Sequence, residues 1–352
     1  MKNYFIRIFI LLLMTYMIPG IIYVFFSEDK VNEVIDDVEI ESTLLIPYEN
    51  IVPKLPNEFD IPVGVVEADL CDYNLKSMEI DNSIEITLVG DDIEVIGLDT
   101  YIVGVLAKEM NPKWPCEALK AQAVAGRTYV LKQLDKSDYI LNSTIHQVYM
   151  SKDEMKKKWG SNFEDYYQKL MNIVLATKYE VIIYDNQFID AVYFSTSNGY
   201  TQDSKYIWSN DIPYLKSVSS PWDKELTNLS REYRFTVDEF LYIFNKQFST
   251  DIDYLSEIVV KRSTTGIFTE VKYKNHTITA EQLRNAYDLR SPVFGLKQSG
   301  NMIYVTTFGF GHLVGMSQYG AYGMALDGYS YEQIVKYYYK DVDIVEYNYL
   351  KS

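Results

Sequence analysis

The 352-residue sequence predicts an α+β fold in which a hairpin of two helices packs on antiparallel strands, after an N-terminal transmembrane helix. Asp99 to Lys132 has the composition of a helix but is interrupted by two prolines, as two helices joined by a short elbow would be. Ile84 to Val95 alternates apolar and polar residues about Gly90 to Asp92, which is typical of a β-hairpin. Further strand and helix signals after residue 224 indicate an inserted α+β subdomain.

Cap signals place the two helices and the elbow between them. Asp99 is suited to cap the first helix, and Asn111-Pro112 ends it, because the residue before a proline avoids the α conformation. Pro115 suits the first turn of the second helix, where its missing N–H is no loss. Glu109 therefore stands at the mouth of the elbow.

Three charged side chains of this hairpin are candidates for chemistry. Lys120 and Arg127 are seven residues apart, so they share one face of the second helix. Glu109 ends the first helix near these cations, and a carboxylic acid held by packed helices can act as a general acid and base. Spacing alone favours the simpler interpretation, a solvated glutamate at a helix end.

Other elements are expected along the rest of the chain. Capping boxes at Ser161, Thr236 and Thr279 each open a helix. The expected helices are Ser161 to about Ala176, Val237 to about Lys246, Ala280 to about Tyr287, Ser317 to about Leu326, and Ser330 to Tyr339. The expected strands are Glu180 to Tyr184 paired with Phe188 to Ser195, a pair between Ile258 and Thr277 that turns near Gly266, and Met302 to Thr307.

The N-terminal region predicts export. An apolar run from Ile8 to Phe26 follows Lys2 and Arg7 and is long enough to cross a bilayer. A polar, acidic segment follows without an Ala-x-Ala cleavage pattern, so residues 1–29 are interpreted as an uncleaved anchor with its N-terminus in the cytoplasm. A cleaved signal peptide is the alternative, and it also exports the remainder. Residues 30–82 then form a tether outside the membrane, and 83–352 the main domain, with 224–300 inserted in it.

Charge and cysteine content bear on partners and covalent links. The formal net charge is −16 and no basic stripe is present, so a nucleic-acid partner is not expected. The two cysteines, Cys71 and Cys116, can pair outside the cytoplasm, but a pair 45 residues apart is a weak indication. Cys116 is interpreted as a core residue of the second helix, and pairing stays open.

Motifs along the chain resemble the stage II sporulation protein D family. The longest runs from Gly104 to Met110 and resumes from Glu117 to Tyr129. Further matching motifs follow in order, namely Phe194 to Gly199, Pro213 to Leu215 with Val218, Ser220 to Asp223, and Gly309 to Ala321. The resemblance extends from about Ile84 to Ile344, so chance is a poor explanation for it.

The resemblance implies a peptidoglycan lytic transglycosylase. Such an enzyme cleaves the β-1,4 bond between N-acetylmuramic acid (MurNAc) and GlcNAc and leaves a 1,6-anhydroMurNAc end, without water as a reactant. The implied setting is forespore engulfment during sporulation, with the catalytic domain outside the mother-cell membrane and facing the forespore. The implied partners are peptidoglycan glycan strands and the stage II sporulation proteins P and M.

The resemblance also implies roles for single residues. Glu109 becomes the single general acid/base, which needs a raised pKa that nearby cations would oppose. Lys120 and Arg127 are therefore interpreted as structural or as contacts to a substrate carboxylate. Other substrate-binding residues are expected in two motifs, with Ser195, Thr196 and Ser197 in the first and His312, Ser317, Gln318 and Tyr319 in the second.

No metal or cofactor is expected. Many relatives hold zinc with two cysteines and a histidine in the stretch equivalent to Tyr139 to Met150. Aligning on Gln147 to Tyr149 puts Leu141 and His146 at the cysteine positions and Ile145 at the histidine position. One imidazole without thiolates is not a zinc site, so His146 is expected to form local hydrogen bonds.

Three other functions compete with this one. A hydrolase built on Ser195 and His312 needs a third, orienting carboxylate, and none stands at a motif position. Some relatives stimulate a cell-wall amidase, so a non-catalytic, glycan-binding activator is the main alternative. A membrane-anchored scaffold would not bind glycan at all.

Overall fold

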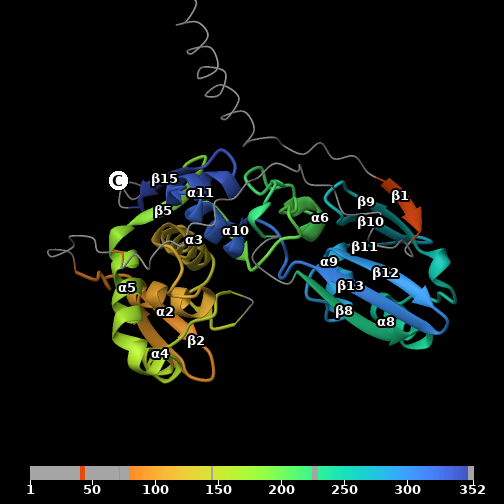
Figure 1. The fold of residues 1–352 in the computed structure, drawn as a ribbon, viewed down its shortest axis with the longest axis horizontal. Helices are drawn as coiled ribbons and strands as arrows, with labels where there is room; N and C mark the ends of the chain where they lie inside the picture. Colours follow the sequence, from red (N-terminus) through yellow and green to blue (C-terminus); the bar gives the residue numbers. More distant parts are fainter. Residues whose placement is uncertain (1–39, 44–70, 72–78, 144–145, 224–228, 348–352) are drawn as a thin grey trace, which may run out of the picture. The chain divides into compact units, whose positions relative to one another are not determined.

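The computed structural model describes residues 40–43, 71, 79–143, 146–223 and 229–347, all in the second of two compact units of the chain, residues 37–352. These residues form helices and several small, mostly antiparallel sheets, which confirms the α+β class (Figure 1). The apolar run from Ile8 to Phe26 lies outside them. Among the described residues, no helix combines the length and the apolar character needed to cross a bilayer.

The two central helices are α2 (Leu98–Glu109) and α3 (Cys116–Leu134), and the elbow between them spans residues 110–115 as predicted. Pro115 is the N-cap of α3. The prediction that Asp99 caps α2 is wrong, because Gly97 is the N-cap. Asp99 is buried in the first turn, where its Oδ2 accepts a hydrogen bond from the backbone N–H of Asp81 at 2.8 Å.

Helix α2 lies in the interior of the fold. It packs on α3, and both pack on α5 (Phe163–Ala176). Nine of its residues are buried, from Leu98 to Ala107, so the helix is apolar on nearly all sides. Gly104 allows the loop before α4 (Lys152–Trp159) to approach, because a Cβ there would collide with the ring of Tyr149. Glu109 is consequently held on a helix that packing fixes from several directions.

The start of α5 differs from the prediction. The helix ends at Ala176 as expected, but Ser161 does not open a capping box, because residues Gly160–Asn162 form a 3-10 turn, η2. The N-cap of α5, Asn162, makes no side-chain cap. A capping box forms one element earlier instead, where Ser151 and Glu154 exchange hydrogen bonds at the start of α4.

Two sheets flank the helices. The predicted hairpin is confirmed as β2 (Glu85–Val89) and β3 (Ile93–Gly97), and β4 (Ile140–Leu141) adds to β2 in parallel. In the second sheet β5 (Glu180–Tyr184) lies between β6 (Gln187–Phe188) and β15 (Asp343–Glu346). Helix α3 packs on β5, so the sheet supports the helix that follows the elbow.

The predicted strand from Phe188 to Ser195 is interrupted, because residues 189–192 do not form a strand. Strand β6 ends at Phe188, and a turn follows in which Val192 N–H donates to the carbonyl of Asp190 at 2.8 Å. The chain then forms β7 (Tyr193–Phe194), which pairs in parallel with β14 (Met316–Ser317). This pairing brings the turn at Ser195 beside the start of α10 (Gln318–Leu326).

The C-terminal helices are confirmed as α10 and α11 (Tyr331–Tyr338), and both pack on α3. The N-caps Ser317 and Ser330 accept hydrogen bonds from the third residue of each helix. Tyr337, Tyr338 and Tyr339 are buried as expected.

Residues 230–308, together with strand β1, form two further sheets with two helices. One sheet has the order β12 (Phe294–Ser299), β13 (Met302–Phe308), β8 (Ser230–Thr236). The other has the order β1 (Ile40–Thr43), β9 (Val259–Arg262), β10 (Phe268–Tyr273), β11 (His276–Ile278). Helices α8 (Val237–Phe248) and α9 (Ala280–Ala286) have the predicted capping boxes. Helix α6 (Ser204–Trp208) lies between β7 and β8 in the chain, and the 3-10 turn η3 (Leu255–Glu257) lies between α8 and β9. Strand β1 shows that part of the predicted tether is a strand of this region.

Cys71 and Cys116 form a disulfide, so the interpretation of Cys116 as a core residue only is incomplete. Both residues are buried, and their Cα atoms are 5.8 Å apart. The bond joins a segment that precedes β2 to the first residue of α3. By the chain-entropy estimate, closing a loop of this length stabilises the fold by about 4 kcal/mol.

Candidate active site

Glu109 lies where two cavities meet. The first, of about 710 Å³, opens toward β7, the glycine-rich turn at Gly311 and α9. The second, of about 500 Å³, opens toward the elbow and α4. Glu109, Ser195 and Gln318 line both cavities. A chain-like ligand that occupied both would therefore contact these three side chains.

The environment of Glu109 favours a protonated carboxyl. Burial raises its pKa, whereas a hydrogen bond from Gln318 and the charge of Lys108 act in the opposite direction. Gln318 Nε2 donates to Glu109 Oε2 at 3.2 Å. Glu109 is also the last residue of α2, where the negative end of the helix dipole disfavours a carboxylate. The net result is an acid whose pKa lies above its ordinary value.

Replacing Gln318 with Met is expected to raise the pKa of Glu109 further, because the amide hydrogen bond favours the carboxylate form. If Glu109 must start protonated, the alkaline limb of the pH–rate profile should move to higher pH, by up to about one unit. Steady-state rates measured across neutral pH would show it. A limb that moved to lower pH would contradict the assignment of this limb to Glu109.

Tyrosines and an amide form the wall of the first cavity beside Glu109. Gln147 Nε2 donates to the hydroxyl of Tyr193 at 3.2 Å, and Gln147 Oε1 accepts from the hydroxyl of Tyr101 at 3.1 Å. Tyr129 and Tyr193 line the cavity with Gln147. Sequence reasoning assigned none of them to the site, because each comes from a different segment and no local motif connects them.

His312 lies in the first cavity as predicted, but as a neutral ring. Burial and the charge of Arg284 lower its pKa to about 4, against a hydrogen bond with the Tyr193 backbone. Its Nδ1 accepts from the backbone N–H of Val314 at 3.1 Å. Ser195 Oγ is bonded to Thr196 Oγ1 at 3.2 Å and not to an imidazole. This arrangement does not fit a serine hydrolase, in which the histidine must take the serine proton.

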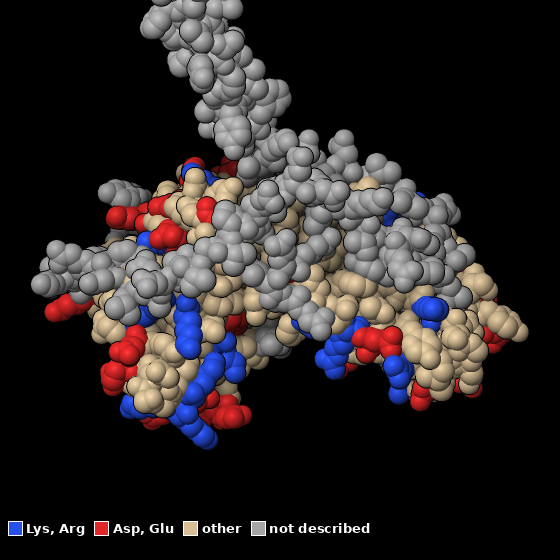
Figure 2. Space-filling model, in the orientation of Figure 1, with Lys and Arg blue, Asp and Glu red and all other residues tan. Residues whose placement is uncertain are grey.

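The second cavity combines aromatic rings with two lysines. Trp114 packs edge-on against Tyr319 with ring centroids 4.9 Å apart. The other lining side chains include Trp159 and Tyr166, and the cations are Lys108 and Lys158. Figure 2 shows basic side chains gathered, beside acidic ones, over the region that α2 and α4 occupy in Figure 1. Aromatic faces next to hydrogen-bonding groups suit a sugar chain, which has both apolar and polar faces.

The structure places the predicted motif residues in two groups. Ser195, His312 and Gln318 line the first cavity, and Tyr319 lines the second. Thr196, Ser197 and Ser317 do not reach either, because they are at most 1% exposed. The prediction that these three bind sugar is therefore corrected.

The two buried serines bind a buried acid instead. Ser317 Oγ donates to Asp223 Oδ1 at 2.6 Å, and Ser197 Oγ donates to Asp223 Oδ2. Ser317 also caps α10 by accepting from Gly320 N–H at 3.1 Å. Gln318, the next residue, contacts Glu109. Asp223 thus fixes the start of the helix that carries Gln318, a role that its place in the Ser220 to Asp223 motif did not reveal.

Replacing Asp223 with Asn is expected to change how stability depends on pH. Burial raises the pKa of this fully buried carboxyl from 3.8 to about 6, although the serines oppose the shift. Between these two pKa values the folded protein keeps a proton that the unfolded chain releases. The free energy of unfolding therefore falls as pH rises from 3.8 to about 6. Over this pH range, the free energy of unfolding of the wild type should fall by about 3 kcal/mol more than that of Asp223→Asn. Urea unfolding at both ends of the range measures this, and equal pH slopes would contradict it.

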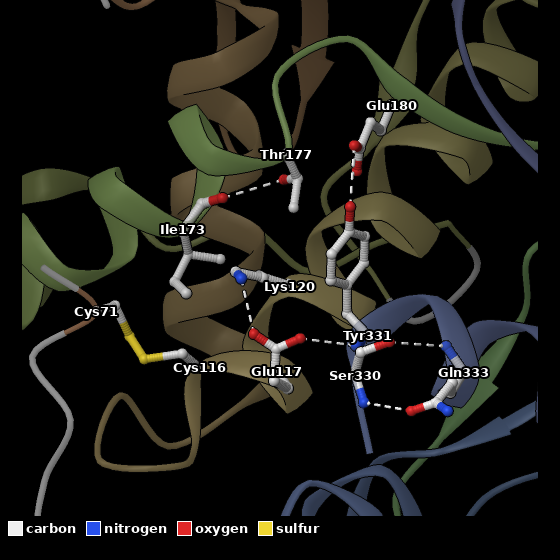
Figure 3. Close-up of polar contacts among 10 residues, drawn as sticks. All are labelled: Cys71, Cys116, Glu117, Lys120, Ile173, Thr177, Glu180, Ser330, Tyr331 and Gln333. Carbon is white, nitrogen blue, oxygen red and sulfur yellow. Dashed lines mark hydrogen bonds and ion pairs between the residues drawn. A yellow bond between two sulfur atoms is a disulfide. The ribbon is translucent and has the colours of Figure 1, made fainter. Parts of the chain in front are cut away.

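Lys120 and Arg127, which share one face of α3, line neither cavity beside Glu109. Lys120 Nζ pairs with Glu117 Oε1 at 2.7 Å and lies over the ring of Tyr331 (Figure 3). The hydroxyl of Tyr331 donates to Glu180 Oε1 at 3.0 Å. Lys120 lines neither cavity, so the structure does not bring it to the candidate site.

Arg127 does not bind substrate, because its side chain is completely buried. Its guanidinium donates to the carbonyls of Thr177 at 2.7 Å, Glu180 at 3.1 Å and Val174 at 3.3 Å. Burial lowers its pKa, while Asp99 and Glu180 support the charged form. Of the two roles left open for Arg127, the structure shows the structural one.

Within the stretch from Tyr139 to Met150, His146 has a local hydrogen-bond partner. His146 Nδ1 accepts from the backbone N–H of Leu141 at 2.9 Å, which confirms its local role. Leu141 has no donor atom in its side chain. Within the described ranges, no three His, Cys, Asp or Glu side chains are grouped so that they could hold a metal ion.

Comparison with known proteins identifies relatives of this chain. The family model "SpoIID: Stage II sporulation protein" matches residues 90–184, which include Glu109. Stage II sporulation protein D of Bacillus amyloliquefaciens is 39% identical over 262 residues, and that of Bacillus subtilis (strain 168) is 39% identical over 265 residues. Each alignment covers 72% of this chain and 76% of the relative.

A further relative has a different description. The amidase enhancer of Bacillus subtilis (strain 168) is 29% identical over 297 residues, which cover 69% of this chain and 40% of that protein. The family matches support a role in sporulation, and the chain belongs to the stage II sporulation protein D family.

Proposed function

We propose that the protein is a peptidoglycan lytic transglycosylase with Glu109 as its single general acid and base. The observation that supports this most is one carboxyl with a raised pKa at the junction of two cavities. Acid–base catalysis near neutral pH needs such a group, because an ordinary glutamate has already lost its proton.

The proposed reaction moves one proton out and one proton back. Glu109 gives its proton to the glycosidic oxygen, and the bond from that oxygen to the anomeric carbon of MurNAc breaks. The 6-hydroxyl oxygen of the same sugar forms a bond to the anomeric carbon. The 6-hydroxyl proton goes to the Glu109 carboxylate, which restores the acid and leaves a 1,6-anhydro end. One carboxyl is sufficient, in contrast to the pair that most glycosidases use.

The surroundings of Glu109 serve the two stages in turn. Burial favours the protonated form at the start, and Gln318 supports the carboxylate that forms when the proton leaves. The two cavities would hold the sugars on either side of the bond that breaks. No step requires a metal or a cofactor.

Product analysis tests the proposal. The purified protein is incubated with glycan strands freed of stem peptides, and the fragments are analysed by mass spectrometry. We expect fragments with anhydro ends, which are lighter by one water than the reducing ends that hydrolysis gives. Reducing ends that incorporate labelled oxygen from water would overturn the transglycosylase assignment in favour of a hydrolase.

A non-catalytic activator of a cell-wall amidase is the second candidate, because of the similarity to an amidase enhancer. In this case the cavities would bind glycan without cleaving it. Intact strands that bind the protein, together with faster release of stem peptides by an added amidase, would favour this function. Intact strands that do not bind would favour a scaffold.

The proposed setting is engulfment of the forespore. The apolar run from Ile8 to Phe26 would anchor the chain in the mother-cell membrane with residues 30–352 outside, facing the forespore. Stage II sporulation proteins P and M are the proposed partners there. Affinity capture of the tagged protein from sporulating cells tests both partners.

A further inference from the structure

Helix α9, from the region of residues 230–308, contributes to the wall of the first cavity, which Glu109 also lines. Glu281, Arg284 and Asn285 of this helix line the cavity. The positions i, i+3 and i+4 lie on one helical face, so the three side chains reach the cavity together. None of them belongs to the motifs that indicated the family.

Arg284 is held in a fixed orientation on this wall. Its Nη1 donates to Glu281 Oε1 at 2.7 Å, and its Nε donates to the carbonyl of Leu289 at 3.1 Å. The side chain is 22% exposed, and among the described residues no partner is found for its Nη2. The guanidinium is thus positioned by the protein with donor capacity left for a ligand.

Arg284 is also the one basic side chain, Lys or Arg, among the described residues that line the first cavity. Its charge acts across the cavity, since it helps to keep His312 neutral. Lys120 and Arg127, the cations that the sequence offered for a substrate carboxylate, lie outside this cavity.

We propose that Arg284 binds the lactyl carboxylate of the MurNAc residue in the first cavity and is a specificity-determining residue. This inference rests on the proposed function, because MurNAc is the sugar of the strand that carries a carboxylate. A guanidinium can donate two parallel hydrogen bonds to a carboxylate, which fixes both the position and the orientation of the sugar. A lactyl group converted to an amide lacks the charge and loses most of this interaction.

Binding is measured with Glu109→Gln protein, so that no cleavage interferes. The probes are a peptide-free MurNAc–GlcNAc tetrasaccharide and the same compound with its carboxylates converted to methylamides. We expect the free acid to bind about 10- to 100-fold more tightly, the range for hydrogen bonds between charged groups. Adding Arg284→Gln should reduce this ratio to below about threefold and leave the affinity for the methylamide unchanged.

Two further variants separate recognition from folding. Arg284→Lys keeps the charge but not the two parallel donors, so it should give an intermediate ratio. Arg234→Gln on β8 removes an exposed guanidinium from the same region and should keep the full ratio. The unchanged affinity for the methylamide shows that the cavity wall is intact.

The outcomes for the two proposals are distinguishable. A ratio that persists after Arg284→Gln is added, or a ratio near one in the Glu109→Gln protein that keeps Arg284, overturns the role of Arg284 even where cleavage gives anhydro ends. A ratio that depends on Arg284, in a protein whose wild type makes no anhydro ends, supports Arg284 and overturns the transglycosylase. If neither probe binds, the role of Arg284 is overturned, and product analysis decides the transglycosylase separately.

Discussion

Replacing Glu109 with Gln is expected to lower the rate of strand cleavage by about 10²- to 10⁴-fold, the usual contribution of general acid–base catalysis. Glutamine preserves the size and the hydrogen-bonding shape of the side chain but can neither give nor take the proton. The affinity for peptide-free strands should stay within about threefold of the wild type. Formation of anhydro ends and binding of uncleaved strands are measured on the same preparation.

The matched control is Glu164→Gln on α5, where the side chain is exposed and lines neither cavity. It should cleave strands at the wild-type rate. A Glu109→Gln variant that still forms anhydro ends at that rate would move the catalytic acid to another residue. A variant that loses binding as well would make Glu109 a recognition group.

Replacing Arg127 with Met is expected to destabilise the folded protein by about 3 to 5 kcal/mol, the cost of breaking a buried charge interaction. The guanidinium satisfies the carbonyls of Thr177, Glu180 and Val174 at a site without solvent. Its loss leaves three buried acceptors without this donor and removes the cation that supports buried Asp99. Urea unfolding of both proteins gives the difference in free energy.

Lys156→Met on α4 is the control for this measurement. Its ion pair with Asp153 joins side chains that are 53% and 92% exposed, so its loss should cost less than about 1 kcal/mol. Arg127→Lys should also destabilise, because an ammonium cannot reproduce the fork geometry of the guanidinium. An Arg127→Met protein as stable as Lys156→Met would contradict the structural role of Arg127.

Local signals in the sequence predicted local structure well. The prolines of the elbow, the hairpin turn after Val89, and the capping boxes at Thr236 and Thr279 act within a few residues, and the structure has each of them. The errors at Asp99 and Ser161 have one cause. A residue suited to a cap was already engaged elsewhere, by the backbone of Asp81 or by a 3-10 turn.

Only the site residues that lie within a family motif could be predicted from the sequence. Glu109 and Gln318 each belong to a family motif, and in the structure Gln318 Nε2 lies 3.2 Å from Glu109 Oε2. The cations could not be assigned, because a face shared on a helix does not show what packs against it. Arg127 faces buried carbonyls, whereas Arg284, outside every motif, lines the first cavity from α9.

The disulfide between Cys71 and Cys116 has a mechanical consequence. The bond closes a covalent ring that contains β2, β3, α2 and Glu109. A force applied to the chain between β1 and Cys71 therefore reaches the first turn of α3 through the disulfide and bypasses every element inside the ring. A protein pulled at this point would keep the segment that carries Glu109 under no load, and reducing agents would remove this protection.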